Sequence, residues 1–406
     1  MREVVLLGST GSIGTQCLEV IENNPGKFRV TALSAGGNNL ELLAAQAVAF
    51  QVPTIAIEQP RADELGDLIR LREQETGVAQ LKRQIITGTK ASAQAAATCS
   101  ASGVVVNGIN GGIGLSSTLS ALDTGATLAL ANKESLVAGG PLVNAHQQYP
   151  GQIVPVDSEH SAIHQCLQSG LHERGLTMPV VTGRSEVRKL ILTASGGPFR
   201  GKKRADLVDV SVEDALKHPT WAMGPVVTIN SSTLMNKALE LIEAHLLFDL
   251  DPEAIEPVIH PQSHIHSGVL WNDGSLLLQA SPPSMLIPIA LGLSWPERLS
   301  DVAPAEDFSE PFSWDFEPVD HEAFPALTLA RQVAKQGGSA PAVMNAANEV
   351  AVQAFRDRKC GFLGIVDTVR QVCDEHQTVA ITELQELLEV QTWAVKRAQQ
   401  LLGLSA

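Results

Sequence analysis

The sequence predicts an α/β protein that begins with a doubly wound domain, continues as an α+β domain and ends in a bundle of helices. From the start to about residue 156, short apolar runs alternate with helical segments. Strand-like and helix-like segments mix between residues 157 and 290, and only helical patterns follow residue 319. We therefore expect domains at 1–156, 157–290 and 319–406, separated by a linker at 291–318.

The first domain is predicted from apolar runs that read as buried parallel strands. They are Val4–Leu7, Val30–Leu33, Thr54–Ile57, Val104–Val106 and Leu128–Leu130. Segments with helical composition, such as 15–22 and 40–50, lie between them. This alternation is typical of a doubly wound parallel sheet.

The rest of the chain is predicted from similar patterns. Strand-like segments lie at 189–193, 226–230 and 276–279. Prolines at 296, 304, 311 and 318 predict that the linker is extended and contains no helix. Helices are expected at 325–336, 341–356, 362–376 and 381–402.

Composition excludes several classes of function. The chain has 406 residues, 44% of them hydrophobic, and a net charge of −15. An acidic surface argues against nucleic-acid or anionic-membrane binding, but a locally basic site can still bind an anionic substrate. We find no transmembrane run or targeting peptide, and the five scattered cysteines read as reduced thiols. We therefore expect a cytoplasmic protein.

A glycine-rich turn after the first strand predicts dinucleotide binding. Gly8, Gly11 and Gly14 stand between the first strand and the first helix, where glycines let the backbone approach a pyrophosphate. The second strand ends at Ser34–Asn39 without the acid typical of NAD sites, which favours NADPH. This is a Rossmann-like pattern. A second glycine-rich run, 107–112, either approaches the cofactor or is a plain loop.

Two carboxylates in the next motif suggest a divalent cation. Asp157 and Glu159 follow an apolar run, and in extended chain they point to one side. Close carboxylates repel each other unless a proton or cation lies between them, and oxygen ligands favour Mg²⁺ or Mn²⁺. The alternative is that Asp157 caps a helix starting near Ser161. Lys133 and its neighbours likewise follow a strand, at the usual ligand crevice.

A third carboxylate is predicted on the helix that begins near Ser231. Asn236, Glu240 and Glu243 share one face of it, and Lys237 joins the hydroxyls and amide near its start as a phosphate-binding group. The alternative is a surface helix with an internal Lys–Glu pair.

Three further loops are candidate site elements. The small-residue loop 194–198 follows a strand and is a second possible phosphate cradle. The proline-bounded loop 218–225 carries Trp221, which is either a lid or a surface anchor. The cluster of histidines at 260, 264 and 266 reads as polar strand residues with His260 near the site, and zinc is a weaker alternative.

Taken in this order, the motifs make the sequence resemble those of the 1-deoxy-D-xylulose 5-phosphate reductoisomerase family, and the resemblance extends along the whole chain. The matching strings are GSTGSIG at Gly8, ANKESLV at Ala131, VDSEH at Val156, LTASGGPF at Leu192, HPTWAMG at His218, LMNKALELIEA at Leu234 and IHPQS at Ile259. The resemblance implies NADPH- and metal-dependent conversion of 1-deoxy-D-xylulose 5-phosphate to 2-C-methyl-D-erythritol 4-phosphate in non-mevalonate isoprenoid synthesis. It also implies a homodimer with no nucleic-acid or membrane partner.

The resemblance assigns a role to each motif. The metal (Mg²⁺ or Mn²⁺) would bind Asp157, Glu159 and Glu240, and these residues with Lys133 and His218 would be catalytic. Phosphate would be held by Ser195, Ser231, Asn236 and Lys237, and the substrate would also meet Ser158, Lys133, His218, Trp221 and Met223. The cofactor would contact Gly8, Thr10, Gly11, Ser12, Ile13, Gly36, Asn38, Asn132, Glu134 and Gly224.

This chain departs from the family's pattern at two of these motifs. Gly37 stands where many members have lysine, and Asn230 replaces an aspartate before Ser231. Two other functions remain as alternatives, an ordinary NADP-dependent dehydrogenase and a non-catalytic NADPH-sensing regulator. Converging carboxylates beside a phosphate cradle argue against the first, and the lack of a partner-binding element argues against the second.

Overall fold

The N-terminal part of the chain forms a parallel sheet in the computed structural model, which describes residues 1–221 and 224–404. The strand order is β4-β3-β2-β1-β5-β6-β7, with every neighbouring pair parallel. The strands are β1 (Arg2–Leu7), β2 (Phe28–Ala35), β3 (Thr54–Ile57), β4 (Gln84–Thr87), β5 (Val104–Asn107), β6 (Thr127–Leu130) and β7 (Ile153–Pro155). The predicted doubly wound sheet is confirmed.

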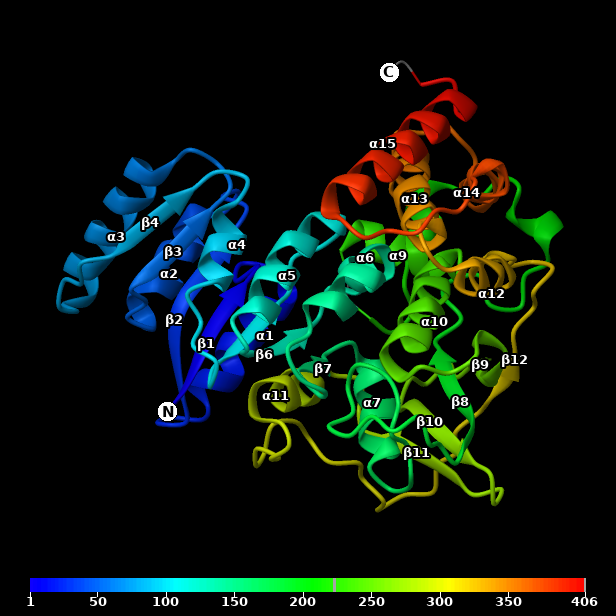
Figure 1. Ribbon diagram of the computed structural model, residues 1–406, viewed down its shortest axis with the longest axis horizontal. Coiled ribbons are helices and arrows are strands. Elements are labelled where there is room, and N and C mark those ends of the chain that lie inside the picture. The colour runs from blue at the N-terminus through cyan, green and yellow to red at the C-terminus, as the bar shows by residue number, and fades with distance from the viewer. Residues whose placement is uncertain (222–223, 405–406) are drawn as a thin grey trace. The chain divides into compact units, whose positions relative to one another are not determined.

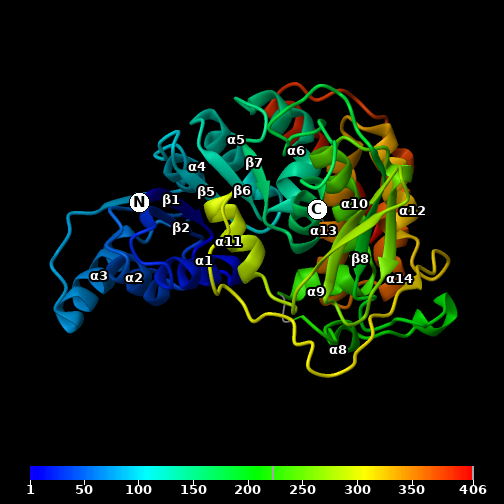
Figure 2. The same ribbon diagram turned by 90° about the horizontal axis from the view of Figure 1, so that it is seen from below.

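Helices cover both faces of this sheet, which explains why its central strands are continuous apolar runs (Figures 1 and 2). One face carries α1 (Ser12–Glu22), α2 (Leu40–Ala49), α3 (Ala62–Thr76) and α11 (Leu286–Ser294), whose apolar residues form one core with the strands. The other carries α4 (Ala91–Ala96) and α5 (Leu115–Asp123).

The chain divides into two compact units that are not contiguous in sequence. The first comprises Met1–Ser135, Val143–Ser161 and Ser284–Ala303, and the second comprises Leu136–Leu142, Ala162–Pro283 and Pro304–Ala406. The chain passes between them within α6 (Lys133–His146) and α7 (Ser158–Leu167). These boundaries differ from the expected ones, because Asp157–Ser161 and α11 join the sheet of the first unit.

The second unit contains a mixed sheet and the C-terminal helices (Figure 1). The strand order is β11-β10-β8-β9-β12, with only β8 and β9 parallel. The strands are β8 (Val187–Ala194), β9 (Ile255–Ile259), β10 (Ile265–Trp271), β11 (Leu276–Ala280) and β12 (Glu317–Pro318). The helices are α8 (Val212–Ala215), α9 (Pro225–Ser232), α10 (Met235–Phe248), α12 (Ala326–Gln336), α13 (Ala340–Arg356), α14 (Phe362–Glu375) and α15 (Leu384–Leu401). The strands expected near 189 and 276 and the four C-terminal helices are confirmed.

The strand expected at 226–230 and the start of the expected linker are both helical. Residues 226–230 belong to α9 and not to a strand, because Pro225 at the first helical position favours a helix start despite the β-branched run. Residues 291–294 complete α11, in which Ile289 and Leu293 are buried against the sheet of the first unit. That burial overrides the proline signal for the first part of the expected linker.

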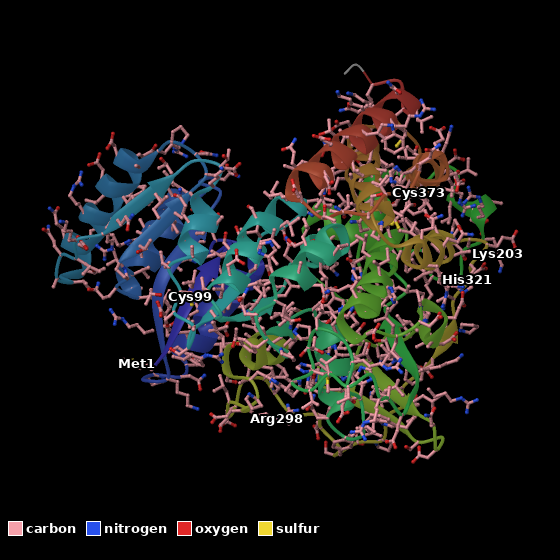
Figure 3. All side chains as sticks on the ribbon, viewed as in Figure 1. Met1, Cys99, Lys203, Arg298, His321 and Cys373 are labelled. Atoms are coloured by element: carbon pink, nitrogen blue, oxygen red, sulfur yellow. The ribbon has the colours of Figure 1, made fainter. Side chains whose placement is uncertain are left out.

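The remainder of the expected linker is extended. Residues 304–316 contain no helix or strand, and β12 then pairs with β9. The end of this segment is held by an ion pair of 2.7 Å between Lys203 and Asp320. Figure 3 labels Lys203 and His321, the residue after Asp320. No helix in the described part of the chain combines the length and apolarity that crossing a membrane requires.

Candidate functional site

The glycine-rich turn lies where the strand order of the first unit reverses. β1 is flanked by β2 and β5, and the chain fills one side of the sheet before the other. Gly8 has φ +80°, and a Cβ there would lie 2.7 Å from the carbonyl oxygen of Gly108. A Cβ on Gly14 would lie 2.4 Å from the carbonyl oxygen of Gly8. Both positions require glycine, and α1 begins beside them at Ser12, in the geometry that suits a pyrophosphate.

The second glycine-rich run lies next to the first and is held there by Asn132. Its Nδ2 donates to the carbonyl oxygens of Ile109 and Gly111, the latter at 2.9 Å. Its Oδ1 accepts from the Ser135 N–H at 2.6 Å, as the N-cap of α6. Asn132 therefore joins α6, whose first turn contains Glu134, to the cofactor crevice. Contact of either residue with a cofactor stays a prediction.

Asp157 and Glu159 lie at the start of α7, just beyond β7. The helix begins at Ser158, so the argument from extended chain is wrong: Ser158 and Glu159 are helical, and the Ser158 hydroxyl donates to Glu159 at 2.5 Å. Lys133 forms an ion pair of 2.5 Å with Asp157, and both side chains are at most 15% exposed. The first unit thus brings a lysine and two carboxylates to the carboxyl ends of β6 and β7.

Glu240 lies one turn into α10, a helix that is buried and not on the surface. Asn236 Nδ2 donates to Glu240 at 2.5 Å, and the Lys237 ammonium pairs with the other carboxylate oxygen. Lys237, Glu240 and Glu243 are each at most 4% exposed. Ser231 belongs to α9 and not to this helix, because Leu234 takes a left-handed conformation with φ +57° and separates the two. The predicted single helix is therefore two.

The loop after β8 forms a cradle with the end of α9. Gly196 and Gly197 have φ of +85° and +65°, and a Cβ on Gly197 would lie 2.9 Å from the carbonyl oxygen of Ser231. The Gly197 N–H donates to Ser195 Oγ at 3.3 Å. The loop thus brings two glycines with positive φ and Ser195 against the Ser231 backbone, and a turn of successive backbone N–H groups of this kind suits a phosphate. The loop of Ser195 therefore approaches Ser231, and phosphate binding by these two residues stays a prediction.

His218 joins this cradle to the loop before α9. Its Nδ1 accepts from the N–H groups of Thr220 and Trp221, at 3.1 and 2.9 Å. Nδ1 is therefore unprotonated, and Nε2–H donates to Ser195 Oγ at 3.0 Å. Burial lowers the pKa of His218, which favours this neutral form.

The loop itself has no regular structure in its described part, residues 217–221. The Trp221 ring lies in an edge-type arrangement with that of His266, with centroids 6.3 Å apart and an interplanar angle of 60°. Gly224 is the N-cap of α9. Met223 lies outside the described residues.

The histidine cluster is structural. His260 Nδ1 donates to the Asp315 carbonyl at 2.9 Å, and Nε2 accepts from the N–H groups of His264 and Ile265. His266 Nε2 lies 3.0 Å from Ser281 Oγ. Only His266 lies in a strand, β10, whereas His260 and His264 lie in the turn between β9 and β10, so the interpretation as polar strand residues holds for His266 alone. His260 anchors the extended segment beside β9.

One buried contact escaped the sequence analysis. Asn348 of α13 donates from Nδ2 to Asn230 Oδ1 at 3.0 Å, and both residues are at most 4% exposed. The signal was a pair of asparagines, at 345 and 348, among the apolar residues of the buried face of this helix. Asn230 directly precedes Ser231, so α13 supports the cradle.

Comparison with known proteins agrees with this arrangement. Family models described as 1-deoxy-D-xylulose 5-phosphate reductoisomerase, its C-terminal domain and DXP reductoisomerase C-terminal domain match residues 4–140, 153–248 and 280–397. The chain is 52% identical to the 1-deoxy-D-xylulose 5-phosphate reductoisomerase of Streptomyces coelicolor, over 100% of this chain and 94% of the relative. The enzyme of that name from Cutibacterium acnes is 52% identical over 93% and 89% of the two chains.

Solved structures agree as well. The reductoisomerase of Zymomonas mobilis in complex with NADPH is 39% identical, with a TM-score of 0.86 and 99% of each chain covered. A DOX-P reductoisomerase in complex with NADPH, fosmidomycin and magnesium is 34% identical, with a TM-score of 0.86 and coverage of 99% and 98%. The dinucleotide turn, the acidic strand ends and the glycine cradle all lie within the matched residues, and the chain belongs to the 1-deoxy-D-xylulose 5-phosphate reductoisomerase family.

Proposed function

We propose that this protein converts 1-deoxy-D-xylulose 5-phosphate to 2-C-methyl-D-erythritol 4-phosphate, with NADPH and Mg²⁺ or Mn²⁺. The reaction belongs to the non-mevalonate pathway of isoprenoid synthesis. Family membership over the full chain supports this activity, as do relatives whose structures contain NADPH, fosmidomycin and magnesium.

The observation that carries the proposal is the cradle of Ser195, Gly197 and Ser231 with neutral His218 beside it. A plain dehydrogenase needs only a cofactor crevice and a proton donor, whereas this chain also has a separate glycine cradle, to which we assign the substrate phosphate, and paired carboxylates. Binding energy from a phosphate held away from the reacting carbons orients the intermediate.

We assign the divalent cation to Asp157, Glu159 and Glu240, as the family resemblance implies. These residues offer hard oxygen donors, and two of them, Asp157 and Glu240, pair with Lys133 and Lys237. A bound cation supplies stabilisation of the negative charge that develops on substrate oxygen during bond cleavage. Ser158 and Lys133 would contact the substrate hydroxyls.

The cofactor is assigned to the glycine turn at Gly8–Gly14 and the loop at Gly36–Asn38. The fit rests on the close backbone approaches at Gly8 and Gly14, where a side chain would clash and only glycine lets the turn pack before α1. NADPH supplies the hydride that reduces the aldehyde formed by the rearrangement. Trp221 and Met223 would cover the substrate and exclude water.

NADPH oxidation with the xylulose phosphate substrate, with and without Mg²⁺ or Mn²⁺, tests the proposal. We expect oxidation that requires both substrate and divalent cation. Oxidation that is indifferent to the cation would favour an ordinary NADP-dependent dehydrogenase. NADPH binding without any turnover would favour a sensing regulator.

The protein is further proposed to act as a homodimer in the cytoplasm. The dimer is supported by the family resemblance and by β11, a sheet-edge strand whose Leu276 is 50% exposed. The compartment is supported by five cysteines that form no disulfide. Light scattering at micromolar concentration should give twice the chain mass, and a monomer mass would rule the dimer out. Cell fractionation tests the compartment.

A further inference from the structure

An arginine from the loop after β3 lies against the loop after β2, where the ribose of a dinucleotide would be recognised. We propose that Arg61 binds the 2′-phosphate of NADPH and so sets the preference for NADPH over NADH. This inference deepens the proposed function and rests on its assignment of the cofactor crevice.

Sheet register brings the two loops together. β2 and β3 are parallel neighbours, and Ala35 pairs with Ile57 at their carboxyl ends. The Glu58 N–H donates to the Ala35 carbonyl at 3.3 Å, so residues 36–39 and 58–61 leave the sheet side by side. In doubly wound sheets the end of the second strand is where ribose hydroxyls or a 2′-phosphate are read.

The loop after β2 carries no cationic side chain, and the backbone at Gly37 does not favour one. Gly37 has φ +103°, and a Cβ there would lie 3.2 Å from the Cβ of Gln59. The Gln59 side chain fills this space and donates from Nε2 to Asn38 Oδ1 at 2.8 Å. A lysine at this position would be strained and displaced. A positive charge has to come from another segment.

Arg61 supplies that charge. Its Nη1 donates to the Gly37 carbonyl at 3.0 Å, and the side chain is 39% exposed. Glu64 accepts from Nε at 2.8 Å and from Nη2 at 2.6 Å. A guanidinium has five N–H donors. Three are used by these contacts, which leaves two that can reach phosphate oxygens.

The charges around Arg61 favour binding of the 2′-phosphate through directed hydrogen bonds, and not through long-range attraction to a positively charged surface. Glu64 neutralises part of the Arg61 charge and holds the guanidinium in one orientation. Glu58 is a second exposed carboxylate on the same loop. Since no acid ends β2, the ribose 2′-hydroxyl of NADH would lack its usual acceptor. Discrimination therefore depends on Arg61 and should weaken as salt concentration rises.

Binding of adenosine 2′,5′-diphosphate and of ADP to the full chain tests the inference without turnover. Isothermal titration should show tighter binding of the 2′,5′-diphosphate by the wild type. Arg61→Ala should weaken that binding by about 10- to 100-fold, the range expected for a lost charge-assisted contact, and leave ADP binding unchanged. Arg61→Lys keeps the positive charge but loses the planar guanidinium with its paired donors. Its affinity for the 2′,5′-diphosphate should lie between those of the wild type and Arg61→Ala.

Arg72→Ala is the matched control. Arg72 lies on α3, the helix that Arg61 precedes, and like Arg61 it pairs with an acid three residues later; it is 45% exposed, and its side-chain partner in the described part of the chain is Glu75 and not the Gly37 loop. It should bind both nucleotides as the wild type does. Equal binding of the 2′,5′-diphosphate by Arg61→Ala and wild type, or an equal loss for both nucleotides, would overturn the inference. If Arg61 discriminates as expected but the wild type does not turn over the xylulose phosphate, only the proposed reaction fails.

Discussion

At the residue scale, the protonation state of His218 determines whether its ring can hold the loop beside the proposed phosphate cradle. Burial lowers the pKa of His218 below its ordinary value of about 6.5, so the neutral ring stabilises the fold above that pH. This stabilisation is lost as pH falls through the lowered pKa, because a protonated Nδ1 cannot accept from Thr220 and Trp221. We expect the amide protection of these two residues to fall below about pH 6.5. Hydrogen exchange against pH measures it, and protection in the wild type that does not vary with pH would contradict the tautomer assigned here.

Neutralising any one of the three carboxylates assigned to the metal is predicted to have the largest effect on turnover of the single substitutions proposed. Asp157→Asn, Glu159→Gln or Glu240→Gln should each lower turnover by at least about 100-fold, because a divalent cation contributes several kcal/mol. NADPH binding should be unchanged, since the glycine turn is untouched. Near-wild-type activity of any one variant at limiting Mg²⁺ would remove that residue from the metal site.

At the scale of elements, α13 is predicted to position the end of α9. Asn348→Ala leaves Asn230 Oδ1 buried without its donor, which should cost about 1–3 kcal/mol of unfolding free energy and raise the substrate KM. Asn345→Ala is the control, because Asn345 is equally buried in α13 but donates to Glu349. Both variants should be less stable, but only Asn348→Ala should alter KM. In an Asn230→Ala background the KM effect of Asn348→Ala should disappear, and its persistence there would rule out coupling through this pair.

The loop before α9 is predicted to be a lid. Residues 217–221 lack regular structure, and Trp221 is only partly buried. Closing over the substrate would bury that ring and shield reactive intermediates from water. Hydrogen exchange and limited proteolysis with and without a phosphonate hydroxamate measure this. Equal protection in both states would mean that the loop is fixed.

Local patterns predicted most elements, because buried parallel strands and amphipathic helices carry strong periodic signals. They failed at residues 226–230, where a proline at the helix start outweighs a β-branched run, and at 291–294, where packing on the sheet completes a helix. The left-handed residue Leu234, which divides the phosphate-binding segment into two helices, also has no local signal.

At the scale of the whole molecule, motif order predicted the family, whereas the unit boundaries were not predictable from composition. Residues 284–303 return to the first unit because Ile289 and Leu293 complete its core, a long-range packing effect. Arg61 was missed for the same reason: it reaches the Gly37 loop through the pairing of β2 and β3, 24 residues away in sequence. Contacts of this kind depend on the assembled sheet.

Product analysis tests the central claim most directly. The wild type is incubated with 1-deoxy-D-xylulose 5-phosphate, NADPH and Mg²⁺, and the carbon skeleton of the product is determined by NMR alongside NADPH consumption. We predict one branched 2-C-methyl-D-erythritol 4-phosphate formed for each NADPH oxidised, and none without the cation. An unbranched, reduced sugar phosphate as the product would contradict the account, because it would mean reduction without rearrangement.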